Sequence, residues 1–171
     1  MASPRHGGNC DLLCDEFIKG ATSQGHLCEK IYLNDLAIRP CQGCDYCTQH
    51  NGRCKIKDDM GQVLTKIMAA QVIVMATPVY FYAMAAQLKL VIDRCVARWM
   101  QIKDKDFYFI MASAEDNPDV MRGTLDGMRG FVACLDDVQE KGVIAAKGVY
   151  RKGEVQNHPA MLKALAAGKL V

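Results

Sequence analysis

Apolar residues recur at helical spacing in several parts of the chain. Residues 9–23 show this spacing, with Gly25 as a suitable stop signal. After Asp59 the apolar stripe follows the i, i+3, i+4, i+7 pattern of an amphipathic helix. The clearest helix is expected between Met84 and Trp99, where the apolar residues share one face. Each of these segments is predicted to cover a sheet with its apolar face.

Continuous apolar runs lie between these helical segments. Gln71–Ala76 and Phe107–Ala112 are typical of strands buried on both faces. Cys28–Leu33 and Val143–Ala146 predict two further strands, and a loop is expected over Thr77–Tyr82. Two more helices are predicted, over 119–135 and after Pro159. This alternation indicates an α/β domain with a parallel sheet.

Composition limits the class of protein. The 171 residues fit a single domain, 1–171, and a net charge of +2 gives no strong field to attract nucleic acid or acidic membranes. Thr77 and Pro78 interrupt the most apolar stretch, and the N-terminus has no apolar leader segment. We therefore expect a cytoplasmic protein with no nucleic-acid or membrane partner. Nine cysteines in such a chain are expected to be reduced and point to metal or redox chemistry.

The N-terminal segment Ser3–Asn9 has the composition of a phosphate-binding loop. Gly7 and Gly8 allow close approach of the backbone, and a helix is predicted to begin directly afterwards. Ser3 and Asn9 offer hydrogen bonds and Arg5 offers positive charge. The alternative is a disordered basic terminus.

Aromatic residues follow the first buried strand. Tyr80, Phe81 and Tyr82 come at its carboxyl end, where ligands bind in open α/β sheets. They could flank a flat ring, with backbone N–H groups at its polar edge. The alternative is that they cover a sheet edge or an oligomer interface.

The most specific signal is a cysteine-rich loop over residues 39–57. Two consecutive C-x-x-C steps are followed by a fourth cysteine, so that four thiolates could surround one point: Cys41, Cys44, Cys47 and Cys54. An iron–sulfur cluster, a zinc ion and four empty thiols all remain compatible with this spacing.

Together these motifs resemble the NAD(P)H-dependent FMN reductase and iron–sulfur flavoprotein group of flavodoxin-like proteins. The resemblance rests on Ser3-Pro4-Arg5, Gly8-Asn9, Pro40-Cys41-Gln42-Gly43-Cys44-Asp45-Tyr46-Cys47, Thr77-Pro78-Val79-Tyr80-Phe81 and Asp93-Arg94. It implies a three-layer, doubly wound parallel sheet. It also implies FMN, a 4Fe–4S cluster on the four cysteines, NAD(P)H as electron donor, and a homodimer or homotetramer.

The resemblance further implies which residues hold the flavin. The phosphate would be bound by residues of the N-terminal loop and first helical turn: Ser3, Arg5, Gly8, Asn9 and Cys10. The ring would be lined by two later loops: Pro78, Val79, Tyr80, Phe81, Ser113 and Ala114. Cys10 stands where a hydroxyl residue is usual, and Tyr82-Ala83 replaces a small pair, which predicts a narrower ring pocket.

The chain departs from the group most at its start. Members of the group have a hydrophobic central strand before Ser-Pro-Arg, whereas here Met1 and Ala2 alone precede it. Four buried strand residues are worth about 6–12 kcal/mol, as much as a typical domain's stability. We expect a truncated or misassigned start, or another segment or subunit in the gap. Restoring an upstream strand is expected to raise stability and FMN retention.

The resulting hypothesis is an FMN-dependent oxidoreductase. A nicotinamide would reduce the flavin, and electrons would pass, through the cluster, to a small-molecule or protein acceptor. No catalytic side chain is predicted. The alternatives are a flavin-only reductase with empty or zinc-bound cysteines, a non-enzymatic electron carrier, and a zinc-stabilised interaction domain.

Overall fold

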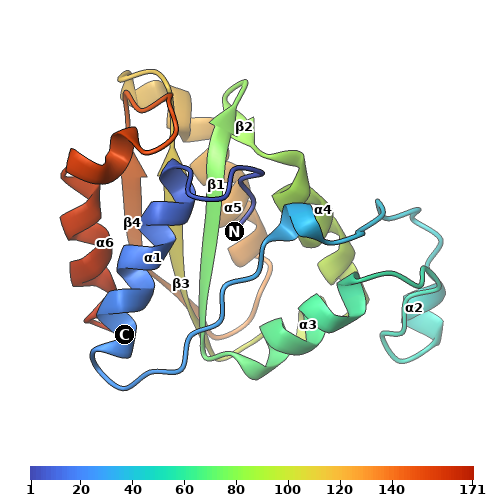
Figure 1. Ribbon diagram of the computed structural model, residues 1–171. Helices are drawn as coiled ribbons and strands as arrows, with labels where there is room; N and C mark the ends of the chain where they lie inside the picture. Colours follow the sequence, from blue (N-terminus) through green and yellow to red (C-terminus); the bar gives the residue numbers. More distant parts are fainter.

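A mostly parallel sheet of four strands forms the centre of the structure, a computed structural model that describes residues 1–171 (Figure 1). The strands lie in the order β2-β1-β3-β4. β1 (Val72–Tyr80), β3 (Lys105–Ala112) and β4 (Val138–Ala146) are parallel, and β2 (Ala83–Met84) returns antiparallel to β1. β3 is buried along nearly its whole length, as its continuous apolar run predicts.

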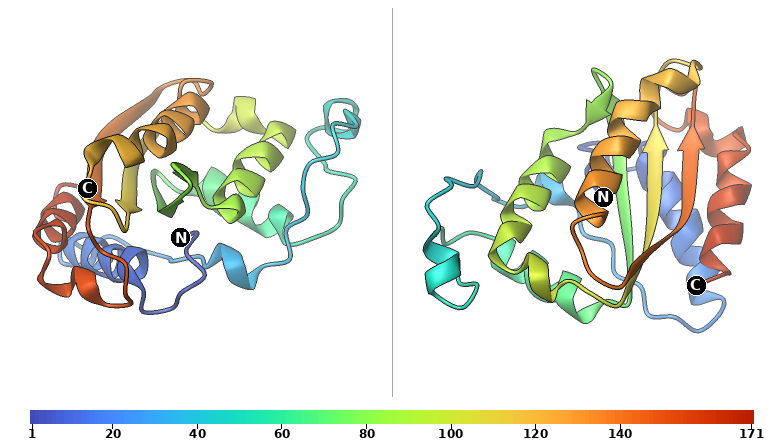
Figure 2. Two further views of the ribbon diagram at one scale, coloured as in Figure 1. Left: turned by 90° about the horizontal axis from the view of Figure 1, so that it is seen from above. Right: turned by 180° about the vertical axis from the view of Figure 1, so that it is seen from behind.

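Helices cover both faces of the sheet (Figure 2). α1 (Asn9–Thr22) and α6 (Ala160–Gly168) pack on one face. α3 (Met60–Ala69), α4 (Ala86–Arg94) and α5 (Arg122–Val132) pack on the other. This three-layer arrangement buries two separate apolar clusters, one on each side of the strands.

Short helices complete the chain. The α2 helix (Tyr46–Gln49) sits in the cysteine-rich loop, which projects from the body of the molecule beyond α3 and α4 (Figure 1). Five 3-10 turns are present: η1 (Leu33–Asp35), η2 (Cys95–Ala97), η3 (Trp99–Gln101), η4 (Pro118–Met121) and η5 (Glu154–Asn157). None of the helices has the length and apolar character that crossing a membrane requires.

The predicted helices and buried strands are present, with three corrections. Residues 28–33 were expected to form a strand, but no strand is assigned there, because the segment meets only Met1 along its backbone. Residues 77–80, expected as loop, instead extend β1, because Val79 and Tyr80 pair with β2. The expected long helix 84–99 ends at Arg94 and continues as 3-10 turns.

Candidate functional site

The N-terminal loop and the carboxyl ends of the strands enclose a cavity of about 130 Å³. It gathers eight of the residues predicted to bind the flavin: Ser3, Arg5, Asn9, Cys10, Pro78, Val79, Tyr80 and Ala114. These residues come from three separate stretches of the chain. The carboxyl edge of a parallel sheet is where ligands bind in open α/β folds, so the cavity has the expected place.

The loop before α1 is a tight turn that requires glycine. The Gly8 N–H donates to the Arg5 carbonyl at 3.0 Å, and a Cβ on Gly8 would lie 2.8 Å from that same oxygen. Gly7 has a φ of +66°, in the left-handed region that favours glycine. Gly8 also caps α1 without a side chain, which leaves the first N–H groups of the helix available to an anion.

Three basic residues belong to this turn or to the loop beside it. The Arg5 guanidinium donates to the Tyr150 carbonyl at 3.0 Å and lies over the Tyr150 ring. The Lys152 side chain lies against Gly7. A Cβ built on Gly7 would be 3.4 Å from the Lys152 Nζ. Arg151 is the third, in the same exposed loop. Backbone donors, small residues and positive charge together fit the phosphate of a bound flavin nucleotide.

Asn9 has a different position from the one expected of a phosphate ligand. Its side-chain amide donates to the carbonyls of Val149 and Arg151 at 3.2 and 3.0 Å, and its Oδ1 accepts from the Val155 N–H at 3.3 Å. The Asn9 side chain therefore holds the loop after β4 against the start of α1. Cys10 lines the cavity but is only 2% exposed, and burial raises the pKa of its thiol.

The two remaining ring-contact candidates lie outside the cavity. Ser113 is buried, and its hydroxyl donates to the Glu115 carbonyl at 2.8 Å. Phe81 is 99% exposed at the tip of the β1–β2 hairpin. Phe81 and Tyr82 both have positive φ, 48° and 64°, which a two-residue hairpin turn requires and bulky residues adopt at a cost.

The loop after β4 belongs to the site, although the sequence did not indicate it. Val149 and Tyr150 line the cavity, and Lys152 lies beside Gly7. The available signal was position: residues 149–153 directly follow the last predicted strand, at the same sheet edge as the other candidates. The run Tyr-Arg-Lys-Gly also has the charge of a phosphate-binding loop.

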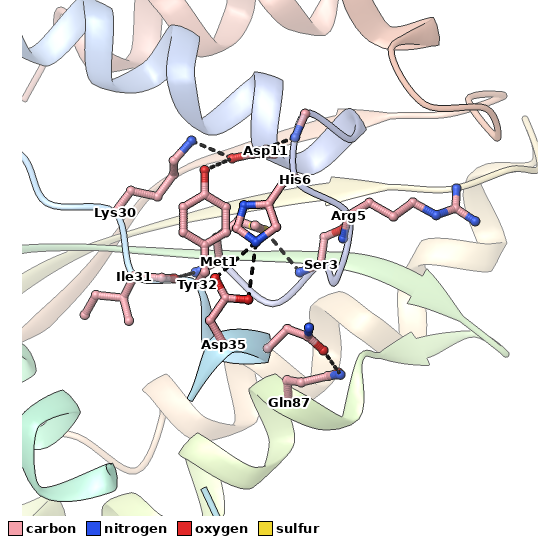
Figure 3. A network of polar contacts seen from close by, with 12 residues as sticks. Met1, Ser3, Arg5, His6, Asp11, Lys30, Ile31, Tyr32, Asp35 and Gln87 are labelled. Carbon is pink, nitrogen blue, oxygen red and sulfur yellow. Dashed lines mark hydrogen bonds and ion pairs between the residues drawn. The ribbon is translucent and has the colours of Figure 1, made fainter. Parts of the chain in front are cut away.

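A polar network holds the N-terminal loop in place (Figure 3). The Asp11 carboxylate accepts from the Gly7 N–H at 2.7 Å and the Tyr32 hydroxyl at 2.9 Å, and it pairs with the Lys30 ammonium. His6 stacks on Tyr32. Desolvation raises the pKa of Asp11, but the hydrogen bonds from Lys30, Gly7 and Tyr32 outweigh it, so the pKa lies below its usual value.

This network makes stability sensitive to acid. The pKa of Asp11 is lower in the folded state than in the unfolded state. The contribution of Asp11 to the free energy of unfolding is therefore complete above about pH 4 and is lost as pH falls through the folded pKa. We expect Asp11→Asn to lower the Tm at pH 7 and to flatten its fall between about pH 4 and pH 2. Thermal melts across this range test it. Asp126→Asn, on the exposed face of α5, is the control and should leave the acid slope unchanged.

The four cysteines of the loop are not gathered in the structure. Cys41 and Cys44 are exposed, Cys47 and Cys54 are half-buried, and no three potential ligands are placed to hold one metal ion. Cys54 is anchored to the body of the molecule by Arg94, whose Nη2 donates to its Sγ at 3.5 Å. As the loop lies here, the thiols do not fit a cluster or a zinc ion.

Fold and site together define a flavodoxin-like α/β protein with a glycine turn and a cavity at the carboxyl edge of its sheet. Residues 1–120 match the model of the NADPH-dependent FMN reductase family, and the chain belongs to this family.

Known proteins of two kinds are similar to the chain. An iron–sulfur flavoprotein of Methanocaldococcus jannaschii is 40% identical over 92 residues, which are 54% of this chain and 47% of that protein. The chain thus spans about half the length of the iron–sulfur flavoproteins it matches. A Bacillus subtilis protein, provisionally named an NAD(P)H-dependent FMN-containing oxidoreductase, is 27% identical over 92% of this chain and 87% of its own. The solved structure of the Trp repressor binding protein from Bacillus subtilis aligns with a TM-score of 0.70 at 25% identity, covering 97% of this chain and 95% of that one.

Proposed function

We propose that this chain is an FMN-dependent oxidoreductase that takes electrons from NAD(P)H and passes them to a small-molecule or protein acceptor. The cavity at the sheet edge carries the proposal, because it brings the glycine turn, the α1 N-terminus and the strand-end loop around one point. FMN, when bound, supplies the uptake of two electrons from a nicotinamide and their release to an acceptor.

The chain's own residues bind and orient the cofactor in this proposal. Ser3 and Arg5, with Gly8 at the start of α1, would hold the phosphate, and Pro78 to Tyr80 would line one side of the ring. At about 130 Å³ the cavity is smaller than sites that enclose a whole ligand. Part of the flavin would lie at the open mouth, where a nicotinamide and an acceptor can reach it.

The test is anaerobic purification followed by an absorption spectrum and turnover. We expect flavin bands after reconstitution with FMN, and oxidation of NADH or NADPH in the presence of a quinone or dye. A folded protein that remains colourless with excess FMN would refute the proposal. Flavin binding without NAD(P)H oxidation would instead identify an electron carrier reduced by another protein.

Lys152 is predicted to contribute to phosphate binding. Replacing it by glutamine removes a positive charge beside Gly7, and loss of one charge-assisted contact is worth about 1.5 kcal/mol, so the Kd for FMN should rise about tenfold. Fluorescence titration with FMN measures this. Riboflavin lacks the phosphate and should bind both proteins equally. Lys163→Gln, on the exposed face of α6, is the matched control, and an equal loss in both variants would argue against the role.

We further propose that the cysteine-rich loop binds a four-cysteine iron–sulfur cluster once it closes around one. The spacing of Cys41, Cys44, Cys47 and Cys54 and the names of the similar archaeal flavoproteins support this. Closing is required because the structure leaves the four thiols apart.

Iron and sulfide assays on anaerobically prepared protein test the cluster. About four irons per chain are expected. Cys47→Ala should abolish the iron content, whereas Cys134→Ala, an exposed cysteine outside the loop, should leave it unchanged. Zinc in place of iron would assign the loop a structural role, and a metal-free loop would leave a flavin-only reductase.

A further inference from the structure

The loop after β4 has a backbone conformation that side chains determine, and not a helix or a strand. It crosses the start of α1 and joins β4 to η5 (Figure 1). Val149 and Val155 are buried at its two ends, whereas most of the residues between them are exposed. Surface loops are ordinarily mobile, because water can satisfy their backbone groups. In this loop the protein itself satisfies them.

Glu154 holds two consecutive backbone amides of the loop. Its Oε2 accepts from the Tyr150 N–H at 2.6 Å and from the Arg151 N–H at 2.8 Å. These hydrogen bonds, from Arg151 and from Tyr150, favour the ionised carboxylate, so the pKa of Glu154 lies below its usual value. Because the carboxylate occupies both amides, the loop can attract an anion only through its side chains.

The carbonyl groups of the same stretch are held by residues near the start of the chain. The Asn9 amide donates to the carbonyls of Val149 and Arg151, and the Arg5 guanidinium donates to the Tyr150 carbonyl. Arg5 belongs to the N-terminal loop, and Asn9 belongs to the first turn of α1. The side chains of three residues therefore fix the loop backbone directly beside the glycine turn.

This fixed backbone determines where the next cation lies. Lys152 follows Arg151 directly, and a Cβ built on Gly7 would be 3.0 Å from the Lys152 Cε. Gly153 has a φ of +85°, which lets the chain turn so that Glu154 reaches back to the loop amides. A lysine that is already held near its ligand loses less conformational freedom on binding than one on a mobile loop.

We propose that Glu154 is a positioning residue for flavin binding. Its carboxylate holds the amides of Tyr150 and Arg151 and thereby keeps Lys152 beside Gly7, where the phosphate is proposed to bind. An acidic residue thus favours the binding of an anion without contacting it. This inference rests on the proposed function, because it assigns a role at the same phosphate site.

Two neutral variants separate the hydrogen bonds of Glu154 from its charge. Glu154→Gln loses the charge but keeps a carbonyl oxygen for the two amides, whereas Glu154→Ala loses both. Fluorescence titration measures the Kd for FMN and for riboflavin, which lacks the phosphate. We expect Glu154→Ala to raise the Kd for FMN about tenfold and to leave that for riboflavin unchanged, whereas Glu154→Gln should stay within about twofold of the unaltered chain.

A control and a double variant make the result specific. Glu140→Ala removes a carboxylate that pairs with Arg129, and it should change neither Kd. In the Lys152→Gln background, Glu154→Ala should raise the Kd for FMN by less than about twofold, because the cation that Glu154 positions is already absent. Amide exchange at Tyr150 should be faster in Glu154→Ala than in the unaltered chain.

Several results would overturn the inference. Equal Kd values for FMN in the unaltered chain and Glu154→Ala would show that the loop needs no such contact. Tighter binding by both neutral variants would show that the carboxylate repels the phosphate. A parallel loss of riboflavin binding in Glu154→Ala would make Glu154 a purely structural residue. The unaltered chain tests the proposed function separately: if it binds no FMN, the proposed function and the inference both fail.

Discussion

Replacing Arg94 by methionine is expected to lower the free energy of unfolding by about 3–5 kcal/mol. Arg94 and Asp58 form a buried ion pair, with side chains 2% and 4% exposed and N–O distances of 2.7 and 3.0 Å. Arg94 also donates to the Arg39 carbonyl at 2.7 Å. Its loss leaves the Asp58 carboxylate buried without a counter-charge. It also frees the two ends of the cysteine-rich loop, which should become sensitive to protease.

Urea unfolding measures this loss, and two further variants make the result specific. Arg122→Met removes a cation from an exposed pair with Asp119, and should change stability by less than about 0.5 kcal/mol. Adding Asp58→Asn to Arg94→Met removes the uncompensated charge and should restore part of the loss. Equal effects of Arg94→Met and Arg122→Met would mean that the buried pair has no special role.

Replacing Gly168 by alanine is expected to destabilise the protein by about 1–3 kcal/mol. A Cβ on Gly168 would lie 2.0 Å from the Phe17 carbonyl oxygen, and one on Gly20 would lie 2.3 Å from the Leu165 carbonyl oxygen. The two glycines thus let α1 and α6 approach backbone to backbone. An added methyl must push the helices apart and disrupt the apolar cluster beneath them.

The control substitution is expected to change stability in the opposite direction. Gly130 lies in α5 with nothing within 4 Å of its Cβ position. Gly130→Ala should therefore stabilise the protein by about 0.5–1 kcal/mol, because alanine favours the helix. Thermal melts of the two variants measure both effects. A gain in both would show that α1 and α6 can separate without cost.

The sequence predicted elements best where local pattern and burial agree. The apolar run 107–112 became β3, and the spacing after Asn9 became α1, since both depend on which face of a segment is apolar. The strand predicted over residues 28–33 is absent because its formation depends on a distant partner and not on local pattern. A strand exists only when its backbone finds a partner, and this segment meets only Met1.

Motifs located the candidate site, but the sequence did not show how its side chains are used. Asn9 carries the expected polar group, yet its amide binds the loop after β4 because that loop crosses α1 at this point. Phe81 follows Tyr80 directly, but the hairpin turn directs it away from the cavity. Lys152 is about 145 residues from Gly7 along the chain, and only folding brings them together.

The sequence by itself determined the α/β class, the order of its main helices and buried strands, and the glycine turn before α1. It could do so because hydrophobic period and turn chemistry are local properties. Only the tertiary structure decided which residues meet: Lys152 with Gly7, Arg94 with Asp58, and Met1 with Ile31. Those contacts join residues far apart in the chain, and their geometry follows from how the layers pack.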